Sequence, residues 1–519
     1  MSEKMKNIII ISVFVLSILL IASSMAFHER KNDNEEWNER YAGKGVSRAS
    51  DIKQTGNGGF IVVGVTAPLS GDTWDAWLLK VDANGNEIWN KSFGGMGNDE
   101  AYSAIESKEG YTIVGSTQHW GETDYDFWLI KTDRNGNEIW NKTYGGKGDD
   151  IAEKIIQTND GGYVVVGYTY SFNTPGDPDI LVVKTDGKGE LQWYKVLGGN
   201  KTEDGNDIIE TDDGYLVSGI TYSYETRGGW DTWLVKMDKD GNEVWNKTYG
   251  WWDFEWNAYV IGIDDGYMIA GYTLSTPTEW GDAYLIKVDK DGNEIWSKKY
   301  GGRDSDQVYD FKKTEDGYIL AGGTHTYSIG DFDAWLLKVD ANGNKIWNKS
   351  FGGRGADGVN SVVVLNGSYV MAGDTEIKFL SEHRIVAWLV KCADYLPPEI
   401  KIIRPKENYF YIFDREITPY DKTLTIGGIT VVAETDDSAK IERVEFYFTG
   451  YNVYEYEPCA VVYNPPYEWK CRRFGVGLPG VITAGAYYGN AGAVAVDKIE
   501  VYIINLFPIS SPSASPAGS

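Results

Sequence analysis

Cysteine and histidine are scarce in this 519-residue chain, which has three cysteines and four histidines. No Cys-x-x-Cys pair or Cys/His cluster has the spacing of zinc ligands, which argues against a structural zinc site. Cys459 and Cys471 lie close together in the sequence, and we predict a disulfide between them in an oxidising compartment. Cys392 is then left over, and we expect it to be a buried apolar residue.

Positive charge is also in short supply. Lys and Arg number 49 against 76 Asp and Glu, which gives a net charge of −27. Nucleic acid is therefore excluded as a partner, because phosphate binding needs a basic surface. The acidity is compatible with solubility, cation binding or a cationic partner. Glutamine is scarce while Lys and Glu are plentiful, which favours a thermophilic source.

Catalytic motifs are missing as well. The chain has no Gly-x-Ser-x-Gly nucleophile elbow and no Gly-x-x-x-x-Gly-Lys-Ser/Thr phosphate loop. Two carboxylates can hydrolyse a glycoside, but with dozens of acidic residues no single pair stands out. No catalytic residue is predicted, and we interpret the chain as non-enzymatic.

Long apolar runs are limited to one, from Ile8 to Ala22. Lys4 and Lys6 precede it and Ser24-Met25-Ala26 follows, the arrangement of an export signal. The run also approaches the length of an uncleaved membrane anchor. Residues 1–27 are thus a signal peptide or a signal anchor, and 28–35 a linker. Both readings predict a secreted or surface-displayed protein that touches the membrane only through an anchor.

The dominant feature that is present is an internal repeat. Tryptophan recurs with spacings of 51–53 at Trp37, Trp89, Trp140, Trp193, Trp245, Trp296 and Trp347. Gly-Tyr/Phe, Gly-x-Thr and Asp-x-Trp-Leu-x-Lys motifs repeat in step with it. A four-stranded unit repeated at this period is typical of a β-propeller.

Each unit predicts four antiparallel strands, lettered A to D. In the third unit they are expected over Ile151–Thr158, Tyr163–Thr169, Ile180–Thr185 and Glu190–Leu197. Asp-Gly and Asn-Gly pairs at the A–B and C–D connections suit tight hairpins.

The ends of the array predict how the ring closes. The last unit lacks strand D, and Glu36–Ala42 supplies a spare one that we expect to pair with Val386–Lys391. Closure removes exposed sheet edges. The fold class is therefore all-β, with a seven-bladed β-propeller over residues 36–395; an open array is the alternative.

These units resemble the seven-bladed propeller repeats of secreted bacterial and archaeal proteins. The resemblance lies in Asp160-Gly-Gly-Tyr, Gly167-Tyr-Thr and Trp140-Asn-Lys-Thr-Tyr-Gly-Gly. The Asp-x-Asn-Gly-Asn-Glu-Ile-Trp stretch is similar to quinoprotein-like repeats, which implies a Trp docked between blades. The likeness implies architecture and not an activity, because propellers have many functions.

The repeat ends at Pro397-Pro398, a boundary signal. Strands are expected over Ile400–Ile403, Thr423–Ala433, Ile441–Phe448, Val481–Tyr488 and Ala493–Ile504. Ile441-Glu-Arg-Val-Glu-Phe-Tyr, Pro465-Pro-Tyr-Glu-Trp469 and Ala486-Tyr-Tyr-Gly-Asn-Ala-Gly492 resemble an immunoglobulin-like module of surface proteins. The resemblance implies a β-sandwich over 396–507 that acts as a spacer or adhesive unit. Residues 508–519 are a Ser/Pro-rich tail expected to be disordered.

The recurrent Asp-x-Asn/Asp-Gly-Asn phrase was tested as a metal loop. It opens like a calcium loop at Asp82, Asn84 and Asn86, but lacks the glutamate at position twelve. A structural turn is favoured over calcium, and neither a metal ligand nor a cofactor is predicted.

Two kinds of connection, D–A and B–C, share one face of such a ring, and this variable face differs most between units. We predict that it binds a glycan or protein at the cell surface through aromatic rings. The predicted binding residues are Trp120, Trp230, Trp251, Trp252, Trp256 and Trp280. The alternatives are rings that pack locally, a hydrolase or quinone-dependent oxidoreductase on the same face, and a purely structural envelope component.

Asn-x-Ser/Thr sequons begin at Asn90, Asn141, Asn200, Asn246, Asn348 and Asn366. Four of them directly follow the strand-D tryptophan. They predict glycosylation on an outer edge, although repetition of the motif alone would also produce them.

Overall fold

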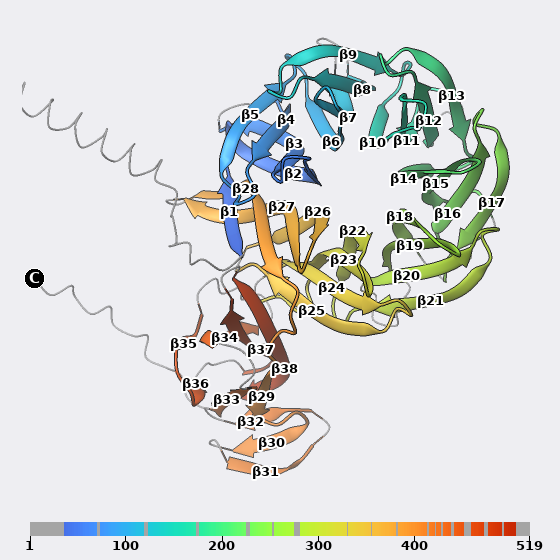
Figure 1. The fold of residues 1–519 in the computed structure, drawn as a ribbon. Coiled ribbons are helices and arrows are strands. Elements are labelled where there is room, and N and C mark those ends of the chain that lie inside the picture. Colours follow the sequence, from blue (N-terminus) through green and yellow to red (C-terminus); the bar gives the residue numbers. More distant parts are fainter. Residues whose placement is uncertain are drawn as a thin grey trace, which may run out of the picture.

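The fold is all-β over the residues described by the computed structural model (Figure 1). These are 36–504, except 70–72, 119–122, 173–175, 225–228, 252–253, 275–280, 330, 354, 380–381, 413–414, 421, 427–428, 437–440, 451–457, 472–475 and 490–491. Within these ranges no helix is long and apolar enough to cross a membrane. The apolar run Ile8–Ala22 and the tail 508–519 lie outside them.

Most of the chain forms four-stranded antiparallel sheets, each built from strands consecutive in sequence and here called repeat sheets. Their strands are β2 (Gly45–Gln54), β3 (Phe60–Pro68), β4 (Asp75–Val81) and β5 (Glu87–Phe93); β6 (Asp99–Glu106), β7 (Tyr111–Gln118), β8 (Tyr125–Thr132) and β9 (Glu138–Tyr144); β10 (Asp150–Gln157), β11 (Tyr163–Thr169), β12 (Asp179–Thr185) and β13 (Leu191–Leu197). The series continues with β14 (Glu203–Thr211), β15 (Gly214–Thr221), β16 (Asp231–Asp238) and β17 (Glu243–Tyr249); β18 (Glu255–Ile263), β19 (Gly266–Thr273), β20 (Asp282–Asp289) and β21 (Glu294–Tyr300); β22 (Asp306–Lys313), β23 (Gly317–Thr324), β24 (Asp333–Asp340) and β25 (Lys345–Phe351). The four strands predicted for the third unit each agree with the structure to within one residue.

The repeat sheets stand around a ring in a propeller-like arrangement, with β2, β6, β10, β14, β18, β22 and β26 (Asp357–Leu365) innermost (Figure 1). Middle strands such as β12 are buried along their whole length, because adjacent sheets cover both of their faces. Outer strands such as β9 alternate between exposed and half-buried residues, since one face meets water. The core therefore lies between neighbouring sheets, where Val164 and Val182 of one pack with Val217 and Trp233 of the next.

The ring closes through a strand from the N-terminal side. β1 (Trp37–Tyr41) pairs antiparallel with β28 (Glu382–Ala393), and Trp37 lies opposite Lys391. With β26 and β27 (Ser368–Phe379) these strands form one more four-stranded sheet. The predicted pairing of the spare strand with Val386–Lys391 is confirmed.

Each outer-strand tryptophan docks on the next sheet, and all except Trp347 cover a glycine in a turn of that sheet. Gly136 has φ +75°, and a Cβ there would lie 2.7 Å from the ring of Trp89. The same glycine must therefore supply a left-handed backbone and leave room for the ring. An outer-strand tyrosine adds a hydrogen bond, as where Tyr300 Oη donates to the carbonyl of Gly343 at 2.7 Å. The turn glycine and the outer-strand tryptophan and tyrosine thus determine how neighbouring sheets contact each other.

The C-terminal part is built from two sheets. One contains β29 (Ile400–Arg404), β33 (Ile429–Thr435) and β36 (Tyr467–Cys471). The other contains β30 (Tyr409–Ile412), β31 (Arg415–Pro419), β32 (Leu424–Ile426), β34 (Ile441–Gly450), β35 (Ala460–Val462), β37 (Val476–Tyr488) and β38 (Ala493–Ile504). Val431 and Trp469 of the first sheet share a core with Phe446 and Ile482 of the second.

One strand prediction in this part is wrong. The segment Thr423–Ala433 holds two strands, β32 and β33, which belong to different sheets. Gly427-Gly428 interrupts the β-branched content of this segment, and a glycine pair inside a strand pattern was the signal for the break. β30, β31, β35 and β36 were not predicted.

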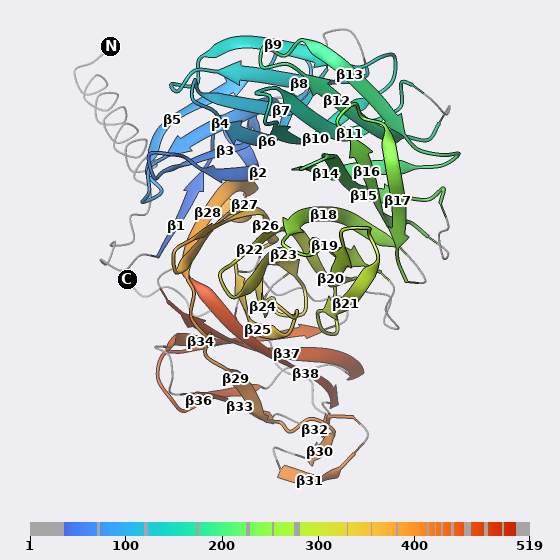
Figure 2. The same cartoon turned by 45° about the vertical axis from the view of Figure 1, so that its right-hand side comes forward.

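The C-terminal sheets are joined directly to a repeat sheet. β38 pairs with the end of β25, where Ser350 lies opposite Val494. Arg303 forms a 2.8 Å ion pair with Glu407, and Lys498 Nζ donates to the carbonyl of His325 at 2.6 Å. Figure 2 shows β37 and β38 lying against the sheet that contains β24 and β25.

Candidate binding site in the axial cavity

A β-bulge interrupts every inner strand near the ring axis. In six of these strands one residue has no partner in the neighbouring strand, and in β18 two residues, Asn257 and Ala258, are left unpaired. The single unpaired residues are Ser50, Tyr102, Glu153, Asn206, Tyr309 and Asn360. A bulge breaks the in–out alternation of a strand, so two successive side chains can reach the axis.

These side chains line a cavity of about 590 Å³ on the axis. All six single bulge residues contribute to its wall, together with Tyr259 of β18. Val65, near the end of β3, and Trp74, just before β4, also line it. Trp74 belongs to a B–C connection and Val65 lies in the part of β3 that leads into it, so the cavity lies toward the variable face predicted from the sequence.

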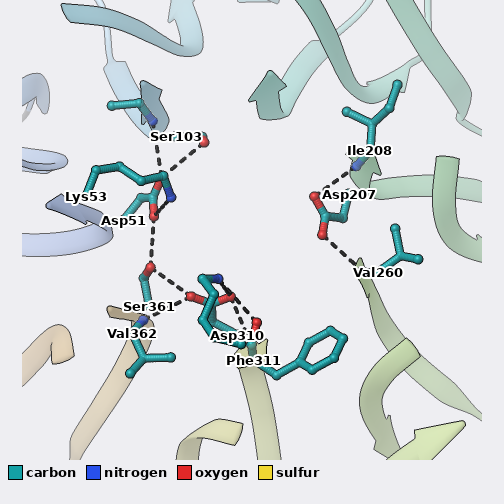
Figure 3. Close-up of polar contacts among 12 residues, drawn as sticks. Asp51, Lys53, Ser103, Asp207, Ile208, Val260, Asp310, Phe311, Ser361 and Val362 are labelled. Carbon is teal, nitrogen blue, oxygen red and sulfur yellow. Dashed lines mark hydrogen bonds and ion pairs between the residues drawn. The ribbon is translucent and has the colours of Figure 1, made fainter. Parts of the chain in front are cut away.

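Apart from Tyr259 in β18, the residue after each bulge is polar or charged, and these residues form a polar network around the axis. Figure 3 shows its members Asp51, Ser103, Asp207, Asp310 and Ser361. Asp51 Oδ1 accepts from Lys53 Nζ at 2.7 Å, and Asp310 is ion-paired with Lys312. The Ser361 hydroxyl lies 2.8 Å from Asp51 Oδ1 and 3.0 Å from Asp310 Oδ2. These contacts join three repeat sheets around the axis.

Three aspartates of the network also hold the backbone of the next sheet. Asp51 accepts the N–H of Ala104 at 3.2 Å, and Asp310 accepts that of Val362 at 2.9 Å. Asp207 accepts the N–H of Val260 at 3.1 Å. Since a bulge frees a backbone N–H from the strand ladder, a carboxylate from the preceding sheet satisfies it.

Lys154 is the central cation of the network. Burial would lower the pKa of its ammonium group, but Asp207, Asp51 and Asp310 together hold that pKa above its usual range. Burial would likewise raise the pKa of Asp51, yet Lys53 and Lys154 lower it below its usual range. The charges therefore compensate one another inside the ring.

A second acidic group lies beside this network without such compensation. Burial, with Asp204 and Glu100 nearby, raises the pKa of Glu153 to about 8. Burial raises the pKa of Asp204 to about 7. A carboxyl with a raised pKa in a cavity is a candidate for binding or acid–base chemistry.

Glu153 makes stability depend on pH. Its folded-state pKa lies above the unfolded value of 4.5, so the native state binds more protons between these values. The contribution of Glu153 to stability is thus lost as the pH rises from about 4.5 to 8. We expect Glu153→Gln to be more stable than the unaltered chain at pH 9 by about 1 kcal/mol or more, and similar to it at pH 5. Denaturant unfolding at both pH values checks this, with the exposed Glu190→Gln as control; a difference independent of pH would contradict it.

The predicted tryptophans are only partly brought together. The ring centroids of Trp230 and Trp256 lie 4.2 Å apart, and Phe254 packs on Trp230 at 5.9 Å. Trp251 packs on Tyr284 at 5.6 Å, with Lys299 over its ring. Trp120, Trp252 and Trp280 lie outside the described residues. The three described rings are half-buried in local contacts, and none of them lines the axial cavity.

One of these residues was assigned to the wrong element. Trp256 was expected in a D–A connection, but β18 begins at Glu255 and includes it. The divergent sequence before it masked the strand start, because the usual Gly-Gly-x-x-x-Asp pattern is replaced there.

The recurrent turn uses its aspartate internally. Asp82 Oδ1 accepts the N–H groups of Asn84 and Asn86 at 2.8 and 2.9 Å. In the equivalent turn, the N–H of Asn137 lowers the pKa of Asp133. These bonds suit the structural turn that the sequence favours. Within the described ranges no three His, Cys, Asp or Glu side chains gather as a metal site.

The sequon asparagines and the cysteines lie in different parts of the fold. Asn90, Asn141, Asn246 and Asn348 lie on outer strands, whereas Asn366 lies between β26 and β27 and Asn200 follows β13. The side chain of Cys471 lies outside the described residues, so the disulfide with Cys459 stays a prediction. Cys392 is buried, and burial raises the pKa of its thiol to about 12.

The axial residues were missed by sequence reasoning, although a signal was present. Two polar residues in succession stand inside strand A at Tyr102-Ser103, Glu153-Lys154 and Asn206-Asp207, among others. Alternation of a half-buried strand forbids such pairs unless a bulge turns both inward.

No family model matches this chain. It is 23% identical over 267 residues to the regulatory protein FlaEY of Caulobacter vibrioides, an alignment that covers 44% of this chain and 27% of that protein. The chain thus spans about a quarter of the length of this curated relative.

Solved structures give only distant likenesses. Sqt1 of Chaetomium thermophilum has a TM-score of 0.41 at 12% identity, covering 70% of this chain and 98% of that one. The phage phi92 endosialidase has a TM-score of 0.39 at 10% identity, covering 93% and 91%. The acylaminoacyl peptidase of Pyrococcus horikoshii has a TM-score of 0.38 at 14% identity, covering 74% and 60%. Likenesses of this size establish no shared activity.

Proposed function

We propose that this protein is a non-enzymatic, extracellular or cell-surface binding protein that recognises a glycan in its axial cavity. The observation that carries the proposal is the convergence of bulge residues from six inner strands, together with Tyr259 of β18, on one cavity of about 590 Å³. This volume is in the range of small-molecule sites, roughly 300–1,000 Å³.

The side chains in the cavity suit a sugar. Tyr102, Tyr259 and Tyr309 supply aromatic surface for the apolar face of a pyranose ring. Asn206 and Asn360 supply amide donors and acceptors for hydroxyl groups. Most of the other lining side chains are polar or charged, which suits a ligand with many hydroxyl groups.

The proposed architecture is a seven-bladed propeller followed by an immunoglobulin-like sandwich. The repeat sheets around the ring, the closing pair of β1 and β28, and the two C-terminal sheets over one core support it. Export is supported by the apolar run Ile8–Ala22 with its preceding lysines. The sandwich is proposed as the unit that positions the ring at the surface.

Tyr309→Ala is expected to weaken glycan binding about tenfold or more, because one aromatic wall of the cavity is removed. A glycan array with the full chain identifies the ligand, and titration calorimetry measures the variant. Tyr194→Ala, an exposed outer-strand residue, is the control and should bind normally. Absence of any glycan ligand, or equal loss in both variants, would remove the proposal.

A second candidate, a secreted glycoside hydrolase, is favoured by one observation. Glu153 lines the cavity with a raised pKa, as a general acid requires, and Glu100 lines the same wall. Turnover of the bound glycan that is abolished in Glu153→Gln, with binding retained, would replace the binding protein by this enzyme.

A further inference from the structure

A second, smaller cavity adjoins the axial one. It measures about 340 Å³ and lies between the second and third repeat sheets, against β6, β7, β10 and β11. Glu100 and Tyr102 line both cavities, so a ligand in the axial cavity can extend into the smaller one.

Four of the eight residues that line this smaller cavity are tyrosines, and we call it the tyrosine pocket. They are Tyr102, Tyr125, Tyr168 and Tyr170. Tyr168 and Tyr170 meet edge to face with centroids 6.2 Å apart, and the Tyr102 hydroxyl donates to Glu100. Tyr168 is half-buried while Tyr170 is exposed, so the pocket opens to solvent at one end.

The tyrosine pocket is acidic. Glu100 and Asp149 line it, and Glu153 and Asp204, two carboxyls with raised pKa, act on its residue Tyr168. Within the described ranges, Lys154 is the cation that acts on Glu153, and its charge is shared with the three axial aspartates. Burial, together with the nearby Asp204 and Glu153, raises the pKa of the Tyr168 hydroxyl.

A separate observation points to a missing ligand. Ser116 borders the tyrosine pocket, is fully buried, and its hydroxyl has no hydrogen-bond partner. A buried hydroxyl without a partner is uncommon in native proteins, because its lost hydration is not replaced. A polar ligand group in the pocket would supply the partner.

We propose that the tyrosine pocket binds a protonated amine carried by a small ligand. Aromatic faces attract an ammonium group through their quadrupoles, and the carboxylates of Glu100 and Asp149 add charge-assisted hydrogen bonds. Four rings with two carboxylates favour an organic cation over a metal ion, since rings offer no oxygen ligands to a hard cation beyond the phenol groups. The inference rests on the proposed function in one respect: if the amine belongs to a sugar, the sugar ring would occupy the axial cavity.

The test is titration calorimetry of the full chain with glucosamine, glucose, N-acetylglucosamine and butylamine. We expect glucosamine to bind about tenfold more tightly than glucose or N-acetylglucosamine, which lack the charge. Tyr168→Leu and Asp149→Asn should each abolish this preference while leaving glucose affinity unchanged. The control Tyr463→Leu, on an exposed residue of the C-terminal part, should retain it.

The outcomes separate the two proposals. If the three sugars bind with equal affinity, the amine site is wrong and the glycan site stands. If butylamine binds and loses affinity in Asp149→Asn while no sugar binds, the amine site stands and the glycan site is wrong. If calcium chloride binds in the pocket and displaces the amine, the site belongs to a metal ion and the inference is overturned.

Discussion

Replacing Lys154 by methionine is expected to lower the free energy of unfolding by about 3–5 kcal/mol. Methionine matches the length and much of the volume of lysine, so packing is largely kept and the charge alone is lost. Asp51, Asp207 and Asp310 then keep buried negative charge without their shared cation. Removing one partner of a buried ion network costs more than the network contributes, because the remaining charges stay desolvated.

Chemical denaturation followed by tryptophan fluorescence measures this effect. Lys142→Met is the matched control, because Lys142 forms an exposed pair with Glu190 at 2.9 Å and should cost less than about 1 kcal/mol. Adding Asp207→Asn to Lys154→Met should restore part of the loss, since it removes one unpaired carboxylate. Equal effects of the two lysine variants would show that the axial network is not energetically special.

Trp37→Ala is expected to lower the free energy of unfolding by about 3–5 kcal/mol. The Trp37 ring packs on Phe60 with centroids 6.4 Å apart, and its Nε1 donates to the carbonyl of Ala83 at 3.3 Å. These partners belong to the first repeat sheet, whereas β1 pairs with β28 of the last. The ring therefore anchors β1 on the first repeat sheet, and β1 is held to the last sheet by its pairing with β28 alone, without a hairpin connection.

Trp193→Ala is the internal control, because Trp193 makes the same kind of contact, with Tyr215 at 6.0 Å, from β13, which a hairpin joins to its neighbour β12. Trp37 is 7% exposed and Trp193 is half-buried, so a smaller loss is expected in the control. Trp37→Ala should also form more aggregates on heating, since the freed edge of β28 can pair with another chain. Equal losses without aggregation would argue against a special role of closure.

The repeat and its turns could be predicted because their causes are local. Gly136 must adopt a positive φ and must also leave space for Trp89, so the residue type is visible at the same place in each unit. The closing strand followed from counting, since Trp37 had no preceding unit. These features need no knowledge of distant contacts.

The axial site was not predicted because its cause is a bulge, and a bulge depends on pairing between strands. Tyr102 and Ser103 look like an exposed and a buried neighbour until the strand register is known. The aromatic rings drew attention instead, yet Trp230 and Trp256 pack on each other and Trp251 on Tyr284. An unusual residue in a connection can serve local packing as readily as binding.

The pairing of β38 with β25 has a mechanical consequence. β38 is held on one side by β37 and near its start by β25, so it belongs at once to the C-terminal sandwich and to the ring. A pull on the end of the chain would load β38 along its length, and the bonds resisting it would act together in shear. Force applied at the end of β38 would thus reach the ring through a continuous sheet.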